Sequence, residues 1–350
     1  MIKLLHSGDW HLDSPLQGRT PQQAAVLRRE LLKIPGRIAS LCKEEACDLV
    51  LLSGDLFDGS YTQESYRTVY GALQSVGVPV FITPGNHDYI CPDSPYEKEV
   101  WPENVYIFKK QQIEWVDIPA LSLRVYGAGF EGMDCPSLLE GFQAEGRAVG
   151  VFHGDPTQVN SPYNPVTKTQ VAQSRLQYLA LGHVHKGDSF RAGDTLCAWP
   201  GCPMGRGWDE EGEKGVLLVS LDETVRTKFV PLRTPQFFDL AVDAAKGVGS
   251  VLPAVPGDDF YRVTLTGEAE CVDLEALQAE FAAFPNLVLR DQTTKPVDIW
   301  AGAGEDNFQG MYFGLLRDAL GDADEETKET ILLAAKLSRQ ILDGQEVALP

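Results

Sequence analysis

Short apolar runs recur along the first half of the chain, and polar or charged residues follow each of them closely. The runs are four or five residues long, which is the length of a buried strand. We therefore predict strands at Ile2–Leu5, Leu49–Leu52, Val78–Ile82, Val149–Phe152 and Tyr178–Leu181.

Helices are predicted between the first three of these strands. Thr20-Pro21 is a favourable helix start, because a capping threonine precedes a proline at the first helical position. The helix is predicted to run towards Cys47, with a kink or break at Pro35-Gly36. A second helix follows Ser60, and its apolar face is predicted to consist of Tyr66, Val69, Tyr70 and Leu73. Strands that alternate with helices predict βαβ units and a parallel core.

After residue 100 the apolar segments are separated by turns, which favours antiparallel additions or a second sheet. The segments are Val105–Phe108, Ile113–Val116, Leu121–Tyr126, Thr195–Ala198, Gly215–Leu221 and Thr224–Val230. Together with the parallel strands they predict an α/β fold, in which two sheets form a sandwich and helices flank the outside.

The length of 350 residues is enough for two domains. The first is predicted to span residues 1–235. Residues 236–304 should form a small α+β unit, with a helix at Asp273–Phe284 and strands at Phe238–Val242, Tyr261–Thr266 and Leu287–Arg290. Residues 305–350 are predicted to form a helical hairpin from Asn307–Leu320 and Ala323–Leu342.

The charge of the chain is strongly negative and unevenly distributed. A net charge of −20 is unfavourable for nucleic-acid binding, which usually needs a basic face. Residues 1–240 hold 22 Lys and Arg against 30 Asp and Glu, whereas residues 241–350 hold 8 against 20. Because the acidic excess is concentrated in the last third, the first domain can approach phosphates more easily than the total suggests.

Compartment signals favour a cytoplasmic protein without membrane association. The chain enters a predicted strand at once and lacks the apolar stretch of a signal peptide. No run approaches the roughly 18 apolar residues of a membrane span. The 7 cysteines include no C-x-x-C pair, which predicts free thiols in a reducing compartment.

Each predicted parallel strand is followed by residue types that bind metals. The motifs are Asp9-Trp10-His11, Gly54-Asp55, Gly85-Asn86-His87-Asp88, His153-Gly154 and Gly182-His183-Val184-His185. Mixed oxygen and nitrogen ligands suit hard-to-borderline metal ions, and ligand sites in α/β sheets form beyond the carboxyl ends of strands. A single histidine after a strand is more often structural, but the joint pattern predicts one bimetal centre.

This series, together with Asp58, resembles the motifs of the calcineurin-like metallophosphoesterase superfamily. Within it the chain is similar to SbcD-type DNA repair exonucleases, and to their YhaO-like branch through the segments His11–Pro15, Pro200–Gly207 and Gly212–Gly215. The resemblance covers roughly residues 1–235 and implies that residues 236–304 form a capping domain. Two departures are Asp58, where some relatives carry a second functional histidine, and Cys202, where serine or asparagine is expected.

The resemblance implies two divalent metal ions. The first would be held by Asp9, His11, Asp55 and His185. The second would be held by Asp55, Asn86, His153 and His183, so that Asp55 bridges the pair. Two metals would activate a water for attack on a phosphodiester, and the neutral ligands would preserve their positive charge. Mixed ligation favours Mn²⁺, with Fe or Zn as alternatives.

His87 is expected to act on the substrate, by stabilising the phosphate or protonating the leaving oxygen, with Asp88 orienting its ring. Arg206 is a candidate phosphate contact. His6 and Trp10 are expected to be structural. Stacking on bases and ordinary loop packing both stay open for Tyr61, Tyr89 and Tyr96.

The function implied by the resemblance is that of a Mn-dependent phosphodiesterase acting as a DNA repair exonuclease or endonuclease. A coiled-coil ATPase of the SbcC or YhaN type is the expected partner, and a homodimer stays open. The C-terminal helices are expected either to dock this ATPase or to pack on their own chain, and both alternatives stay open. The alternatives are a small-molecule phosphodiesterase or nucleotide pyrophosphatase, and a non-catalytic scaffold of a repair complex. A protein phosphatase is disfavoured, because that branch carries Asp-Arg-Gly and Gly-Asn-His-Glu where this chain has Asp58-Gly59-Ser60 and Asp88.

Overall fold

The structure is a computed structural model that describes residues 1–321 and 323–344. The chain divides into two compact units. The first contains Met1–Leu240, Pro253–Arg262 and Phe281–Val288, and the second contains Ala241–Leu252, Val263–Glu280 and the described residues from Leu289 onward. The domain boundaries after residues 235 and 304 stay predictions, and residues 322 and 345–350 of the predicted hairpin lie outside the described residues.

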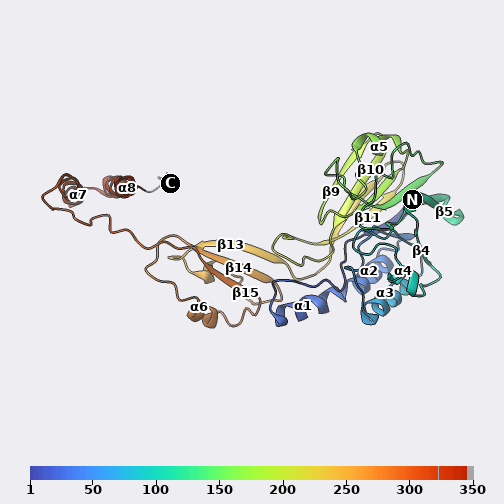
Figure 1. The fold of residues 1–350 in the computed structure, drawn as a ribbon, viewed down its shortest axis with the longest axis horizontal. Coiled ribbons are helices and arrows are strands. Elements are labelled where there is room, and N and C mark those ends of the chain that lie inside the picture. Colours follow the sequence, from blue (N-terminus) through green and yellow to red (C-terminus); the bar gives the residue numbers. More distant parts are fainter. Residues whose placement is uncertain (322, 345–350) are drawn as a thin grey trace. The chain divides into compact units, whose positions relative to one another are not determined.

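The N-terminal apolar runs form the first sheet of the first unit (Figure 1). Its order is β12-β11-β1-β2-β3-β4, with β1 at Ile2–Ser7, β2 at Leu49–Leu52, β3 at Val80–Ile82, β4 at Val105–Ile107, β11 at Gly215–Leu221 and β12 at Arg226–Pro231. Strands β1 to β4 are parallel, as predicted for β1, β2 and β3, and β11 and β12 are antiparallel. Placing Val105–Phe108 among the antiparallel additions was wrong, because the short helix α4 (Pro95–Lys98) lies between β3 and β4 and β4 runs parallel to β3.

The second sheet of the first unit has the order β5-β6-β7-β8-β10-β9. Its strands are β5 at Glu114–Ile118, β6 at Leu123–Ala128, β7 at Ala148–His153, β8 at Tyr178–Gly182, β9 at Lys186–Ala192 and β10 at Thr195–Gly201. Strands β6, β7, β8 and β10 are parallel, and the two edge strands are antiparallel to their neighbours. Strand β9 escaped prediction because its residues are polar and mostly exposed, so it carries no apolar pattern.

The core between the two sheets is made by the inward-facing residues of both. Leu4, Leu49, Leu51 and Phe81 from the first sheet and Val149, Val151, Tyr178 and Ala180 from the second belong to one buried cluster. Since these strands are covered on both faces, they read as unbroken apolar runs. The predicted α/β two-sheet sandwich flanked by helices is confirmed.

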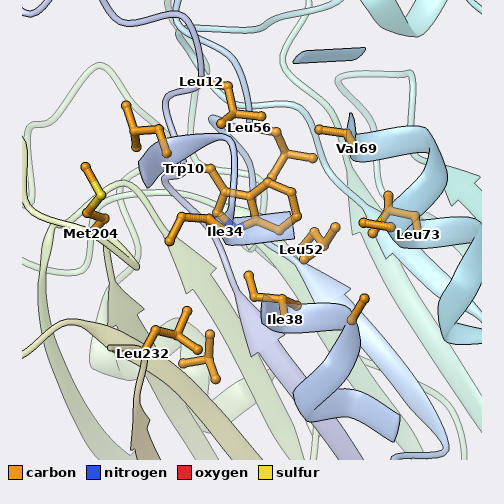
Figure 2. Packing of buried hydrophobic residues seen from close by; sticks show 14 of the residues in the cluster. Trp10, Leu12, Ile34, Ile38, Leu52, Leu56, Val69, Leu73, Met204 and Leu232 are labelled. Carbon is orange, nitrogen blue, oxygen red and sulfur yellow. The ribbon is translucent and has the colours of Figure 1, made fainter. Parts of the chain in front are cut away.

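Helices α1 (Pro21–Leu31), α2 (Ile34–Glu44) and α3 (Gln63–Val76) pack in a cluster with residues of the first sheet. Thr20 caps α1 in a capping box with Gln23. The predicted break falls just before Pro35, since proline fits the first turn of a new helix. Figure 2 shows Trp10 surrounded by side chains of this cluster, as expected for a structural residue.

His6 links the two sheets of the first unit. Its Nδ1 lies 2.7 Å from the Tyr178 hydroxyl on β8, and its Nε2 lies 3.1 Å from Ser53 Oγ. Complete burial lowers the pKa of His6 to about 3, so the ring is neutral near neutral pH. The prediction that His6 is structural agrees with these contacts.

A third sheet has the order β13-β14-β15, with β13 at Phe237–Asp243, β14 at Phe260–Thr266 and β15 at Leu287–Asp291. The second unit holds α6 (Leu274–Glu280), α7 (Phe308–Ala319) and α8 (Glu325–Leu342), close to the predicted ranges. Arg339 on α8 lies over the Phe313 ring at 4.1 Å and donates to the Ala301 carbonyl. Within the part of the chain that the structure describes, no helix has the length and apolar character to cross a membrane.

Candidate metal centre

The seven predicted metal ligands meet at one edge of the first unit, where parallel strands of both sheets end. Asp9, His11, Asp55 and Asn86 follow strands β1, β2 and β3 of the first sheet. His153, His183 and His185 lie at or after the ends of β7 and β8 of the second sheet. The site is thus assembled from two layers, as expected for a ligand site beyond the carboxyl ends of strands.

One group of ligand atoms surrounds the Asn86 side chain. Asn86 Oδ1 lies 2.9 Å from His153 Nε2 and 3.2 Å from His183 Nδ1. His153 Nε2 also lies 3.3 Å from Asp55 Oδ2. These are the four residues predicted for the second metal, and the structure brings them together.

A second group lies around His11. Its Nε2 is 3.0 Å from His185 Nε2 and 3.7 Å from Asp55 Oδ2. Ligand atoms of Asp9, His11 and His185 all lie within 4.8 Å of one another. Because Asp55 Oδ2 is close to both groups, this carboxylate stands where a bridging ligand is needed.

The spacing and chemistry of these atoms fit metal ions. A cation with bonds of about 2.1 Å holds neighbouring ligand atoms about 3 Å apart. The pairs His11–His185 and Asn86–His153, at 3.0 and 2.9 Å, match this spacing. Two carboxylates, four imidazoles and one amide oxygen are a donor set suited to first-row divalent metals.

Two of the predicted histidine ligands are held in position through the ring nitrogen that faces away from the centre. His153 Nδ1 lies 2.9 Å from the Ser53 carbonyl, and His185 Nδ1 lies 2.6 Å from Glu210 Oε1. A bond of this kind fixes the tautomer and leaves the opposite nitrogen free to bind a metal. The observed contacts therefore point Nε2 of both rings into the site.

The backbone at four of the predicted ligands has an unusual conformation. Asp9, His11, Asp55 and His183 have φ values of 54°, 47°, 52° and 91°, in the left-handed region that non-glycine residues rarely adopt. Strain of this kind clusters at functional sites, where the surrounding fold enforces it. Gly85 is required here, because a Cβ would lie 2.2 Å from Asp55 Oδ1 and 2.8 Å from the His153 ring.

The charges of the centre are coupled. Burial alone would raise the pKa of Asp55, but the charge of His153 and the hydrogen bond between them hold it well below the usual range. Burial and the neighbouring His153 lower the pKa of His183 to about 4. An ionised Asp55 and a neutral His183 are the protonation states that metal binding needs.

His87 is oriented by Asp58 and not by Asp88. His87 Nδ1 lies 2.7 Å from Asp58 Oδ1, and this hydrogen bond raises the pKa of His87. The prediction for Asp88 was wrong, because its buried carboxylate accepts hydrogen bonds from the Tyr96 hydroxyl and from backbone N–H groups. Those N–H groups belong to Asp55, Leu56, Phe57 and Gly85. Asp88 thus shapes the ligand loops, and burial together with the charge of Asp55 raises its pKa to about 6.

Arg206 lies at the edge of the centre with two acidic partners. Its guanidinium is 2.9 Å from Glu210 Oε1 and 3.6 Å from Asp58 Oδ2. The predicted phosphate contact stays a prediction. Sequence reasoning missed Glu210, whose only signal is its position four residues after Arg206 in an irregular loop. At the other departure, Cys202 is buried and lies against the His185 carbonyl.

Two of the three tyrosines singled out in the sequence are engaged within the fold. The Tyr61 hydroxyl donates to Glu99, and Tyr96 is buried against Asp88. Tyr89 is half-buried and lines a pocket beside His87. Tyr89 is therefore the one of these three that lines the pocket beside His87, and stacking on bases stays a prediction.

A two-sheet α/β sandwich with clustered carboxylates and imidazoles fits the class of metal-dependent phosphoester hydrolases. Residues 2–187 match the family described as Calcineurin-like phosphoesterase, and the chain belongs to this family. The family uses a dimetal centre, which agrees with the two groups of ligands described above.

Two curated relatives come from Bacillus subtilis (strain 168). The chain is 28% identical over 297 residues to the uncharacterized metallophosphoesterase YhaO, covering 78% of this chain and 71% of that protein. It is 25% identical over 268 residues to the D subunit of the nuclease SbcCD, covering 62% of this chain and 66% of that protein. These similarities agree with the SbcD-type and YhaO-like branch.

Solved structures are similar at low identity. One is TT1561 of Thermus thermophilus, with a TM-score of 0.41, 14% identity, and coverage of 65% of this chain and 98% of that one. Another is a dimetal phosphatase from Danio rerio, with a TM-score of 0.42, 11% identity and coverage of 65% and 98%.

Proposed function

We propose that the chain is a Mn-dependent phosphodiesterase that cuts DNA ends or single strands. The observation that carries the proposal is the juxtaposition of two ligand groups, sharing Asp55, with a histidine that belongs to neither. Similarity to one component of the nuclease SbcCD supports DNA as the substrate. Iron and zinc stay as alternatives to manganese, because the same nitrogen and oxygen donors bind them.

The ligand set suits an anionic substrate. Bound divalent cations would lower the pKa of a water and offset the charge of a phosphodiester. Asp9 and Asp55 are the two carboxylates among the seven proposed ligands, and the imidazoles and the Asn86 amide are neutral as ligands. The centre therefore keeps a net positive charge towards the phosphate when it is loaded.

His87 is proposed to supply the leaving-group proton. Asp58 holds Nδ1, so Nε2 is the nitrogen that can donate to the leaving oxygen as the phosphorus–oxygen bond breaks. The hydrogen bond with Asp58 raises the pKa of His87. Arg206, next to Asp58, is proposed as a contact for a non-bridging phosphate oxygen.

Purified protein with Mn²⁺ is expected to hydrolyse single-stranded DNA and bis-p-nitrophenyl phosphate, and to leave a phosphopeptide intact. Activity should disappear with a chelator and return with Mn²⁺. Rates with Fe²⁺ and Zn²⁺ at equal loading would test the choice of metal. Hydrolysis of bis-p-nitrophenyl phosphate and of a nucleotide pyrophosphate, without cleavage of DNA, would favour the small-molecule alternative.

A coiled-coil ATPase of the SbcC or YhaN type is proposed as the partner of the C-terminal helices. Phe308, Met311 and Leu315 on α7 are 78%, 56% and 72% exposed, and their spacing places them on one face. An exposed apolar face of this kind is typical of a helix that docks against another protein. Helix α8 is expected to take part in the same docking, and there Leu332, Leu333, Ile341 and Leu342 are exposed as well.

Replacing Phe308, Met311 and Leu315 together by serine is expected to abolish co-purification with the ATPase, because the apolar contact area is lost. Hydrolysis of bis-p-nitrophenyl phosphate should stay at the wild-type rate. The matched control replaces Gln309 and Asp318, two exposed polar residues of the same helix, by serine. Retained co-purification in the apolar variant would place the docking surface elsewhere.

A further inference from the structure

A pocket of about 280 Å³ adjoins His87. Asn86 and His87 form one part of its wall, and Phe57, Tyr89, Cys91, Ser94, Pro95 and Met133 are among the residues that form the rest. The volume lies just below the range, roughly 300–1,000 Å³, that small-molecule sites occupy. The pocket therefore has room for part of a substrate beside the proposed general acid.

The pocket offers flat and polarisable side chains to a ligand. Tyr89 is half-buried, and neither its ring nor its hydroxyl has a partner among the described residues. Met133 is 58% exposed, although large apolar side chains are usually buried. Aromatic rings and methionine thioethers are favourable contacts for a nucleobase.

Ser94 adds an unused polar group. It is 5% exposed, and its hydroxyl has no hydrogen-bond partner within the described part of the chain. It stands at the start of α4 but makes no capping hydrogen bond to that helix. Since buried polar groups are nearly always paired, this hydroxyl is available to a ligand.

The charges around the pocket favour a neutral ligand. No lysine or arginine belongs to the described residues that line it. Its two carboxylates are already engaged, Asp88 by backbone N–H groups and Asp93 by Lys98. A phosphate group would find no lysine or arginine here, whereas an uncharged nucleoside would find a ring, a thioether and a hydroxyl.

We infer that this pocket holds the nucleoside whose oxygen leaves during hydrolysis. The inference rests on the proposed function, in which His87 protonates the leaving oxygen and so fixes the side on which the leaving group lies. The phosphate then stays at the metal centre, and the base of the leaving nucleoside packs against Tyr89 and Met133. Ser94 donates to or accepts from the sugar or the base.

Cys91 allows occupancy to be measured without any reaction. It lines the pocket and is partly exposed, whereas Cys271 is exposed in the second unit and serves as an internal reference. Thymidine carries both sugar hydroxyls and no phosphate, so it can bind as a leaving group but cannot be hydrolysed. At a few times its dissociation constant it should slow alkylation of Cys91 by N-ethylmaleimide about threefold or more and leave Cys271 unchanged.

Protection should persist with a chelator, because thymidine carries no phosphate group that the metal ions would bind. Ser94→Ala and Tyr89→Ala should each weaken it, whereas Ser75→Ala on helix α3 should not. Deoxyribose, which lacks a base, should protect poorly. Equal alkylation of Cys91 with and without thymidine, or equal slowing at both cysteines, would overturn the inference.

Cleavage of DNA is measured separately on the same preparations, which distinguishes the two proposals. DNA hydrolysis without protection of Cys91 would overturn the inference that the pocket binds a nucleoside and would support the proposed nuclease function. Protection of Cys91 without DNA hydrolysis supports the pocket and overturns the proposed substrate.

Discussion

Replacing Asp55 by asparagine is expected to empty the centre of both metals and to lower phosphodiester hydrolysis by about a thousandfold or more. Asp55 Oδ2 stands 3.7 Å from His11 Nε2 and 3.3 Å from His153 Nε2, so one carboxylate serves both ligand groups. Asparagine keeps the size of the side chain but removes the negative charge that offsets two dications. Metal content of the washed protein, measured by mass spectrometry, tests the expectation.

Asp13→Asn is a suitable control for this variant. Asp13 is an acidic residue of a neighbouring loop that accepts hydrogen bonds from Thr62, and it is not a proposed ligand. The control should bind two metals per chain and keep its activity. If Asp55→Asn also keeps both metals, the carboxylate does not bridge, and the assignment of the two sites must be redrawn.

His87→Ala is expected to separate catalysis from metal binding. The variant should hold both metals yet lose about a thousandfold in the rate of DNA cleavage, which is within the range for removal of a general acid. The deficit should be much smaller with bis-p-nitrophenyl phosphate, because p-nitrophenolate leaves readily without a proton. Comparing the two substrates on one metal-loaded preparation therefore reports on proton donation itself.

Asp58→Asn is a variant of intermediate expected effect. It weakens the hydrogen bond that orients His87 and leaves the His87 ring in place. Its rate on DNA should fall between those of wild type and His87→Ala. An equal deficit of His87→Ala on both substrates would mean that the histidine binds the phosphate and does not protonate the leaving group. Loss of metal in His87→Ala would mean that His87 is itself a metal ligand.

The clustering of the seven proposed ligands could be predicted because each one is tied to a recognisable local pattern. A buried parallel strand is an unbroken apolar run, and polar residues directly after it must emerge at the same edge of the sheet. The order of strands within each sheet and the division of ligands between two sheets were not accessible, since pairing depends on contacts between distant segments. The polar edge strand β9 could not be predicted from the sequence, because it buries no apolar face and so has no apolar pattern.

Roles that depend on side-chain direction were the least predictable part of the site. Asp88 follows His87 in the chain, and this adjacency suggested that the two interact. In the structure the carboxylate of Asp88 turns into the protein while His87 meets Asp58, which is 29 positions away. Glu210 reaches His185 across 25 positions through a loop without any periodic pattern. Such partners follow from tertiary packing and leave no mark at a fixed spacing.

The division of the ligands between two sheets gives metal loading a mechanical meaning. Asp9, His11, Asp55 and Asn86 belong to one layer, and His153, His183 and His185 belong to the other. A metal ion bound by residues of both layers would hold the two sheets together at the edge where their parallel strands end. The free energy of metal binding would then add to the free energy of unfolding. Metal supply in the cell would therefore govern the lifetime of the folded protein as well as its rate of hydrolysis.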